Sequence, residues 1–208
     1  MSREFEAIYH EENEALARVL RRALGKSGLK MPVAQGGPLQ ILDLACGPCR
    51  EAATLAEVFR EVRGGSDSVR FVGADIRRRE LDEAAARARN AGRQGDSFEF
   101  LTENCAKIGR HAELGSEFDV TFLRHQNYWN DRPVWQRIFE QGLNKLKDDG
   151  LLVITSYFDR EHDLALQALE RAGAELMVTE INESSRLLPT DSPGKSVDRH
   201  VAVFRRRS

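Results

Sequence analysis

Short apolar runs alternate with amphipathic segments along most of the chain. The runs that predict buried strands lie at residues 39–45, 69–75, 98–103, 118–123 and 150–156. Segments with apolar residues at helical spacing lie between or after them, at about 50–62, 78–91, 106–114, 132–147 and 162–172. This alternation predicts an α/β fold, with a doubly wound, mostly parallel sheet that carries helices on both faces.

The two ends of the chain depart from this alternation. An amphipathic helix is predicted over residues 4–25, and the loop Gly36-Gly37-Pro38 precedes the first strand. The last two strands, 174–182 and 197–205, have no helix between them and should form a hairpin with one antiparallel member. We therefore expect a seven-stranded sheet in a single domain, with the helix and loop over 1–37 and the core over 38–208.

Composition narrows the class of protein. The 208 residues are 41% hydrophobic, enough for one substantial core, and the formal net charge of −2 argues against a broad basic surface for nucleic acid. No apolar run approaches the roughly 20 residues of a membrane span. Three cysteines do not make a disulfide framework, and the acidic start of the chain is unlike a secretory signal. These features predict a cytoplasmic protein without a membrane partner.

The tetrapeptide Cys46-Gly47-Pro48-Cys49 supports two interpretations. A C-x-x-C pair at the start of a helix is typical of thiol oxidoreductases, although Ala45 stands where such enzymes usually carry tryptophan. A zinc site would need more ligands. Because Cys105 lies in a different predicted loop and no second C-x-x-C exists, we expect no metal site.

The same tetrapeptide directly follows the first strand, where a doubly wound sheet binds its ligand. Only Gly47 matches the glycine pattern that cradles a dinucleotide pyrophosphate, and Pro48 has no N–H to offer. A cofactor without phosphates, such as S-adenosylmethionine, tolerates this loop. Asp75, which closes the second strand, is positioned to accept hydrogen bonds from a ribose. The run Arg77-Arg78-Arg79 would suit a 2′-phosphate, so an NADP-dependent oxidoreductase stays open.

From residue 39 to about 206 the chain resembles the class I S-adenosylmethionine-dependent methyltransferases. Asp43-Leu44-Ala45-Cys46-Gly47 is similar to their glycine-rich first motif, although Cys49 replaces the last glycine often found there. The resemblance implies the methionine end of the cofactor near Asp43, Asp75 on the ribose and Ile76 on the adenine. The other cofactor contacts that it implies come from Ala45, Cys46, Gly47, Asn104 (where Asp is commoner), Cys105 and Arg124.

The methyl acceptor is expected near the loop after the fourth strand, which is dense in polar and aromatic residues. His125 is the candidate general base, because imidazole titrates near neutral pH. Asn127, Tyr128 and Trp129 are candidate substrate contacts, and Tyr9 on the N-terminal helix is expected to cover the pocket.

The sequence thus predicts a methyltransferase that moves a methyl group to an N, O or S nucleophile. A small molecule is the preferred acceptor, with protein and RNA left open. A non-enzymatic protein that only binds S-adenosylmethionine is an alternative, followed by the NADP-dependent and thiol oxidoreductases.

Overall fold

The computed structural model describes residues 3–26, 28, 37–65, 68–89, 91–115, 117–190 and 192–207. Within this part of the chain, seven strands form one sheet in the order β3-β2-β1-β4-β5-β7-β6. The strands are β1 (Leu39–Leu44), β2 (Val69–Asp75), β3 (Ser97–Thr102), β4 (Phe118–Leu123), β5 (Leu146–Ser156), β6 (Ala174–Ile181) and β7 (His200–Arg206). The first five strands pair in parallel, and β7 is antiparallel to both of its neighbours, β5 and β6. The strand order reverses at β1, as predicted.

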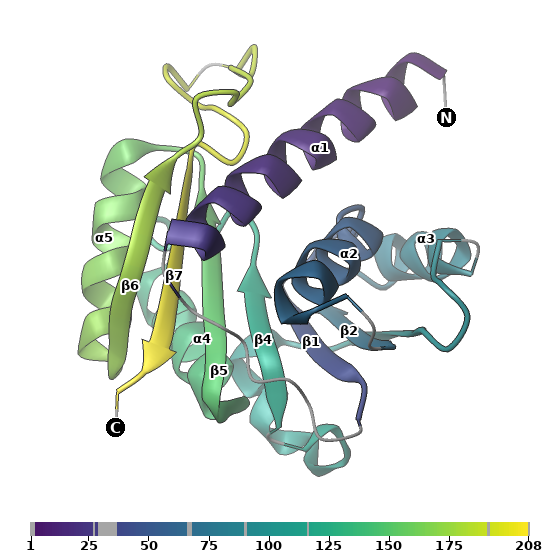
Figure 1. Ribbon diagram of the computed structural model, residues 1–208. Coiled ribbons are helices and arrows are strands. Elements are labelled where there is room, and N and C mark those ends of the chain that lie inside the picture. Colours follow the sequence, from purple (N-terminus) through teal and green to yellow (C-terminus); the bar gives the residue numbers. More distant parts are fainter. Residues whose placement is uncertain are drawn as a thin grey trace.

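Helices cover both faces of the sheet and define two apolar cores (Figure 1). One core joins the sheet to α1 (Arg3–Lys26), α2 (Ala52–Arg63) and α3 (Arg78–Ala88). The other joins it to α4 (Arg132–Asn144), α5 (Asp159–Arg171) and the 3₁₀ helix η1 (Cys105–Arg110). The inner strands are mostly buried on both sides, as expected for a doubly wound sheet, whereas the edge strands β3 and β6 are partly exposed. None of the described helices combines the length and apolar character needed to cross a bilayer.

Helix α1 adds a cover to this three-layer arrangement. Leu16, Val19, Leu20 and Ala23 are spaced to form one apolar stripe, and all four are buried. The stripe packs against α2 and against β6 and β7. In Figure 1 the helix runs diagonally across the β5–β7 region and on past the carboxyl end of β4. Its amino-terminal half therefore lies above the sheet edge where a ligand is expected.

The predicted hairpin and the helices agree with the structure except over residues 106–114. That segment forms two short 3₁₀ helices, η1 and η2 (Ala112–Leu114), instead of one α-helix. The reason is local: Asn104 caps η1 by accepting a hydrogen bond from Ala106 N, and only Cys105, Ile108 and Leu114 are buried. Too few apolar side chains are available to hold a longer helix against the sheet. Gly36, in the loop predicted before the first strand, lies outside the described residues, and so does Asp191.

Four non-glycine residues in the described chain adopt the left-handed backbone conformation. They are Ala45, Cys49, His125 and Asp198, with φ of +57°, +48°, +54° and +47°. This conformation costs an L-residue roughly 1–2 kcal/mol. The four follow β1 and β4 or precede the antiparallel β7, so they gather at one edge of the sheet. Strain concentrated in this way is typical of a functional site.

Candidate functional site

A cavity of about 860 Å³ opens at the carboxyl edge of β1, β2 and β4. The loop after β1 forms its floor, and α1 and the segment before β7 cover it. Eleven of the residues predicted for the site line it: Tyr9, Ala45, Cys46, Gly47, Asp75, Ile76, Asn104, Cys105, Arg124, His125 and Asn127. Residues separated by more than 100 positions in the sequence therefore share one cavity.

The loop after β1 is tied to the end of β2 by Asp75. The Asp75 carboxylate accepts hydrogen bonds from Gly47 N at 2.8 Å, from Arg77 N at 2.9 Å and from Arg77 Nε at 3.0 Å. Burial alone would raise the pKa of Asp75, but these hydrogen bonds outweigh it and hold the pKa below its usual value. The carboxylate is therefore ionised at neutral pH and able to accept further hydrogen bonds.

Arg77 lies across the floor of the cavity. Gly47 has a φ of +55°, which favours glycine, and a Cβ atom placed there would displace the flexible Arg77 guanidinium, whose Nη2 lies 2.5 Å away. Arg77 also pairs with Glu80 at 3.0 Å, and its side chain is about half exposed. A ligand that uses Asp75 must share it with Arg77 or displace the arginine.

The neighbouring wall offers an apolar surface and an amide. Ile76 is 68% exposed although it is large and apolar, which leaves a face for a flat ligand to cover. Asn104 uses Oδ1 to cap η1, so its Nδ2 amide is the group that faces outward for recognition. Beside them, Cys105 is buried, and burial raises the pKa of its thiol to about 12.

Arg124 lies at the opposite end of the cavity, in a buried ion-pair network. Its guanidinium contacts Glu51 Oε2 at 2.9 Å and Asp198 Oδ2 at 2.7 Å, with Asn13 Oδ1 at 3.3 Å. Burial alone would lower the pKa of Arg124, but the two carboxylates outweigh it and the pKa is raised. Both carboxylates engage Arg124, which also lines the cavity, so its contact with a cofactor stays a prediction.

His125 is held by the same network. Its Nε2 lies 2.9 Å from Asp198 Oδ1, and its ring stacks on Tyr157 at 3.9 Å between centroids. Asp198 Oδ1 also accepts the Thr155 hydroxyl at 2.8 Å. Burial would raise the pKa of Asp198, but the charges of Arg124 and His125 outweigh it and hold the pKa well below its usual range. Asp198 Oδ1 suits a hydrogen on Nε2, whereas Asp198 N, at 3.2 Å, donates to an unprotonated Nε2, so these two contacts favour opposite tautomers of His125.

Two segments cover the cavity, α1 and the segment before β7. An ion pair between Glu12 of α1 and Arg186 of that segment joins them. Ile8 and Tyr9 of the same helix line the cavity. The guanidinium carbon of Arg50 lies 4.1 Å from the centre of the Tyr9 ring, a cation–π contact. These contacts fix α1 over the mouth of the cavity.

A second cavity of about 500 Å³ adjoins the first and shares His125, Asn127 and Tyr157 with it. Trp129 lines this second cavity and packs against Phe158 at 4.9 Å between ring centroids. Glu161 also lines it, and burial raises the pKa of this carboxyl to about 7. Trp129 is therefore separated from the main cavity by the His125–Tyr157 pair.

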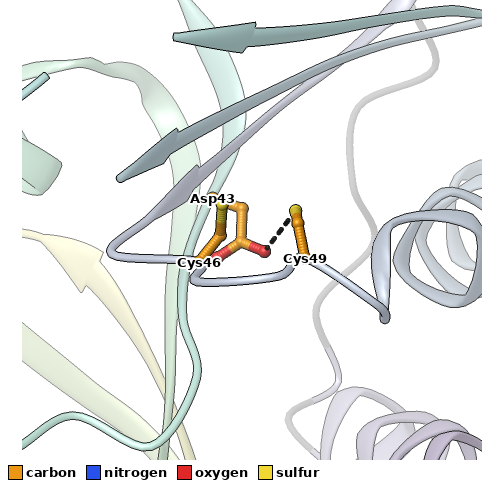
Figure 2. A group of neighbouring side chains, drawn as sticks. All are labelled: Asp43, Cys46 and Cys49. Atoms are coloured by element: carbon orange, nitrogen blue, oxygen red, sulfur yellow. Dashed lines mark hydrogen bonds between the residues drawn. The ribbon is translucent and has the colours of Figure 1, made fainter. Parts of the chain in front are cut away.

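Two predicted site residues do not line either cavity. Tyr128 is buried and stacks on Phe139 of α4 at 5.7 Å, so it packs the core instead of contacting a substrate. Asp43 is fully buried below the floor, beside Cys46 and Cys49 (Figure 2). Burial, together with Glu51, raises the pKa of Asp43 well above its usual value.

The buried C-x-x-C thiols are poorly suited to redox catalysis. Cys46 and Cys49 are 6% and 3% exposed, and burial raises the pKa of Cys49 well above its usual value. A catalytic dithiol needs an accessible, low-pKa thiolate. Two arginines of the run already pair with carboxylates, Arg77 with Asp75 and Arg79 with Glu83, so a 2′-phosphate would compete with these pairs. Neither oxidoreductase interpretation is supported by the geometry.

Sequence reasoning missed three residues of the site: Glu51, Arg186 and Asp198. Glu51 lies close after the first motif, where the sequence pattern indicates only the start of a helix. Asp198 and Arg186 flank a proline- and glycine-containing loop with no apolar periodicity, so no local pattern distinguishes them. Only the return of the chain to the sheet through β7 brings them to the cavity.

Comparison with known proteins places this geometry in context. A family model described as a methyltransferase domain matches residues 37–196, and no curated protein matches the sequence. The TehB-like S-adenosylmethionine-dependent methyltransferase of Corynebacterium glutamicum is similar in fold, with a TM-score of 0.57 and 18% identity over 90% of this chain and 87% of that one. Magnesium protoporphyrin IX methyltransferase of Synechocystis with bound S-adenosylmethionine gives a TM-score of 0.62, at 15% identity over 97% and 81%. An arsenic(III) S-adenosylmethionine methyltransferase of Chlamydomonas reinhardtii gives 0.55, at 16% identity over 91% and 73%.

Proposed function

Since the chain belongs to the family of methyltransferase domains that use S-adenosylmethionine, we propose that it methylates a small molecule held in the cavity under α1. The observation that carries this proposal is the ion-paired cover over part of the cavity. Glu12 and Arg186 join the two segments that lie over it. The volume of about 860 Å³ is near the upper end of the range for small-molecule sites, which leaves room beside a cofactor. A macromolecular acceptor would need a more open mouth.

The cofactor end of the cavity is formed by the ends of β1 and β2. We assign the ribose hydroxyls to Asp75, whose ionised carboxylate suits two O–H donors. The exposed face of Ile76 is the surface for adenine, and the Asn104 amide is the donor for a ring nitrogen. The backbone of Ala45, Cys46 and Gly47 passes beneath the rest of the cofactor.

S-adenosylmethionine supplies a methyl group already activated by the sulfonium, so the protein must mainly align the acceptor and exclude water. The stacked pair His125 and Tyr157 borders the acceptor end. His125, which lines this end of the cavity, is the group that removes a proton from an O–H, N–H or S–H acceptor. Asn127 is available there to orient the acceptor.

The test follows the methyl label. Protein is incubated with radiolabelled S-adenosylmethionine and, in separate reactions, the low-molecular-mass fraction, the total protein and the total RNA of a cell extract. We expect label to be transferred in the small-molecule fraction alone. Label in protein or RNA would refute the small-molecule acceptor while leaving the methyltransferase activity intact.

His125→Gln tests the base. Loss of a general base lowers the rate by about 10²- to 10⁴-fold, while affinity for S-adenosylmethionine should stay near that of the wild type. His10→Gln, on the exposed surface of α1, is the matched control. An unchanged rate in His125→Gln would exclude this histidine from proton transfer.

A further inference from the structure

Two thiols and a carboxylate converge beneath the floor of the cavity. The ligand-type atoms of Asp43, Cys46 and Cys49, here called the Asp-Cys-Cys cluster, all lie within 4.8 Å of one another. All three residues are at least nine-tenths buried, and all come from β1 and the loop that follows it (Figure 2). Neither the cofactor nor the acceptor assignment uses these three side-chain groups together.

The spacing matches a tetrahedral metal site. Zinc binds thiolate sulfur at about 2.3 Å and carboxylate oxygen at about 2.1 Å, which places the two ligand atoms about 3.6 Å apart in a tetrahedron. The observed distance from Cys49 Sγ to Asp43 Oδ2 is 3.6 Å, and the dashed line in Figure 2 marks this contact. The same geometry requires two sulfurs about 3.8 Å apart, within the spread of the cluster.

Unsatisfied oxygen atoms give an independent indication. Asp43 Oδ1 and Glu51 Oε1 are both buried, and no N–H or hydroxyl group of the described residues donates to either, although the two carboxyl groups are neighbours that one shared proton would satisfy. Arg124 contacts the other oxygen of Glu51 only. Buried carboxylate oxygens are costly unless a proton or a cation satisfies them. Cys46 lines the main cavity, which gives a small ion a route to the cluster.

The backbone at Cys49 adds a further reason to look for a role. Its φ of +48° is the conformation that glycine adopts without cost, and a side chain there is strained by roughly 1–2 kcal/mol. A cysteine at such a strained position is explained if its thiol binds a ligand. Two thiols and a carboxylate favour a thiophilic ion over magnesium or calcium.

We propose that the Asp-Cys-Cys cluster binds a thiophilic divalent cation, Zn²⁺ first, through Asp43, Cys46 and Cys49, with water as the fourth ligand. The ion would fix the loop after β1 in the shape that carries Gly47 to Asp75. Binding displaces the thiol protons and any carboxyl proton to solvent, and no electron transfer is involved. This site is distinct from the acceptor site, and its occupancy does not depend on which molecule is methylated.

The experiment measures metal directly. Protein is purified in reducing, chelator-free buffer, and its zinc content is determined by mass spectrometry. The metal-free protein is then titrated with Co²⁺, which reports thiolate ligation by a sulfur-to-cobalt charge-transfer band. We expect stoichiometric zinc and this band in the wild type.

Cys49→Gly removes a ligand and relieves the left-handed strain, so the variant should keep the wild-type fold by circular dichroism. It should lose both the zinc and the cobalt band. Cys105→Ser is the matched control: this thiol is equally buried but outside the cluster, and its variant should keep both.

Three outcomes would overturn the site. They are the absence of zinc and of the cobalt band in the wild type, equal loss of metal in both variants, or a Cys46–Cys49 disulfide that persists in the reducing buffer. If a shared proton between Asp43 and Glu51 satisfies the buried oxygens, the wild type should show neither zinc nor the cobalt band. Titration with S-adenosylmethionine is run on the same samples. Cofactor binding without metal refutes the cluster alone, whereas metal without cofactor binding refutes the proposed function alone.

Discussion

The two ends of the cavity are built in opposite ways. At the cofactor end, Gly47, Asp75 and Arg77 interact within about 30 positions of sequence, and the arginine is half exposed. At the acceptor end, Arg124 reaches Glu51, Asp198 and Asn13 across 73, 74 and 111 positions, and the network is buried. The first arrangement can rearrange when a ligand enters. The second is held by the whole fold and presents His125 in a fixed orientation.

Removing Asp198 should have the largest effect on stability. Asp198→Ala leaves Arg124 with one carboxylate partner in a buried site, a change that costs about 3–5 kcal/mol when an ion pair is broken from one side. Urea denaturation would measure it. Asp148→Ala removes an almost fully exposed partner of Arg206 and should leave the midpoint unchanged. Similar midpoints for the two variants would contradict a rigid acceptor end.

Asp75→Ala tests the cofactor end. A hydrogen bond to a charged group contributes about 1.5–3 kcal/mol, so affinity for S-adenosylmethionine should fall by about ten- to a hundredfold. The folding midpoint should change less than in Asp198→Ala, because Asp75 sits at the cavity surface. Isothermal titration measures the affinity, with the exposed Asp82→Ala as control. Wild-type affinity in Asp75→Ala would refute the ribose assignment.

Glu161, which lines the second cavity, should make the free energy of unfolding depend on pH. Its pKa is about 7 in the fold and about 4.3 in an unfolded chain. Between these values the folded protein binds a proton that the unfolded chain has released, so this group's contribution to the free energy of unfolding falls as the pH rises through the window. Glu161→Gln should remove that fall, as measured by denaturation at several pH values. Glu170→Gln on the exposed face of α5 is the matched control, and parallel pH curves for wild type and Glu161→Gln would contradict the shift.

The smallest effect is expected at Arg77. Since its guanidinium occupies part of the Asp75 carboxylate, Arg77→Ala should tighten cofactor binding, by no more than the roughly 0–1 kcal/mol of an exposed ion pair. Titration of S-adenosylmethionine at two salt concentrations measures this. Weaker binding in the variant would show that Arg77 contacts the cofactor instead of competing with it.

The same contrast explains what the sequence could predict. The parallel sheet, its switch point at β1 and the antiparallel β7 follow from the period of the apolar residues, and the cofactor end lies in contiguous motifs around Gly47 and Asp75. The partners of His125 could not be predicted, because Asp198 sits in an irregular loop whose position depends on the pairing of β7 with β5. The positions of the two aromatic residues after β4 could not be predicted either, because they depend on packing. Tyr128 packs in the core, and Trp129 lines the second cavity.

The four residues in the left-handed conformation limit how far the thermal stability of the protein can be raised without loss of activity. Replacing Ala45, Cys49 or His125 by glycine would relieve backbone strain and would attract a search for thermostable variants, whereas at Asp198 the loss of the buried ion pair with Arg124 outweighs that relief. Three of the four carry side chains that this cavity or the cluster beneath it uses. Selection for heat resistance and selection for activity should therefore diverge at these positions, and stabilising changes are better sought on the surfaces of α3 and α5.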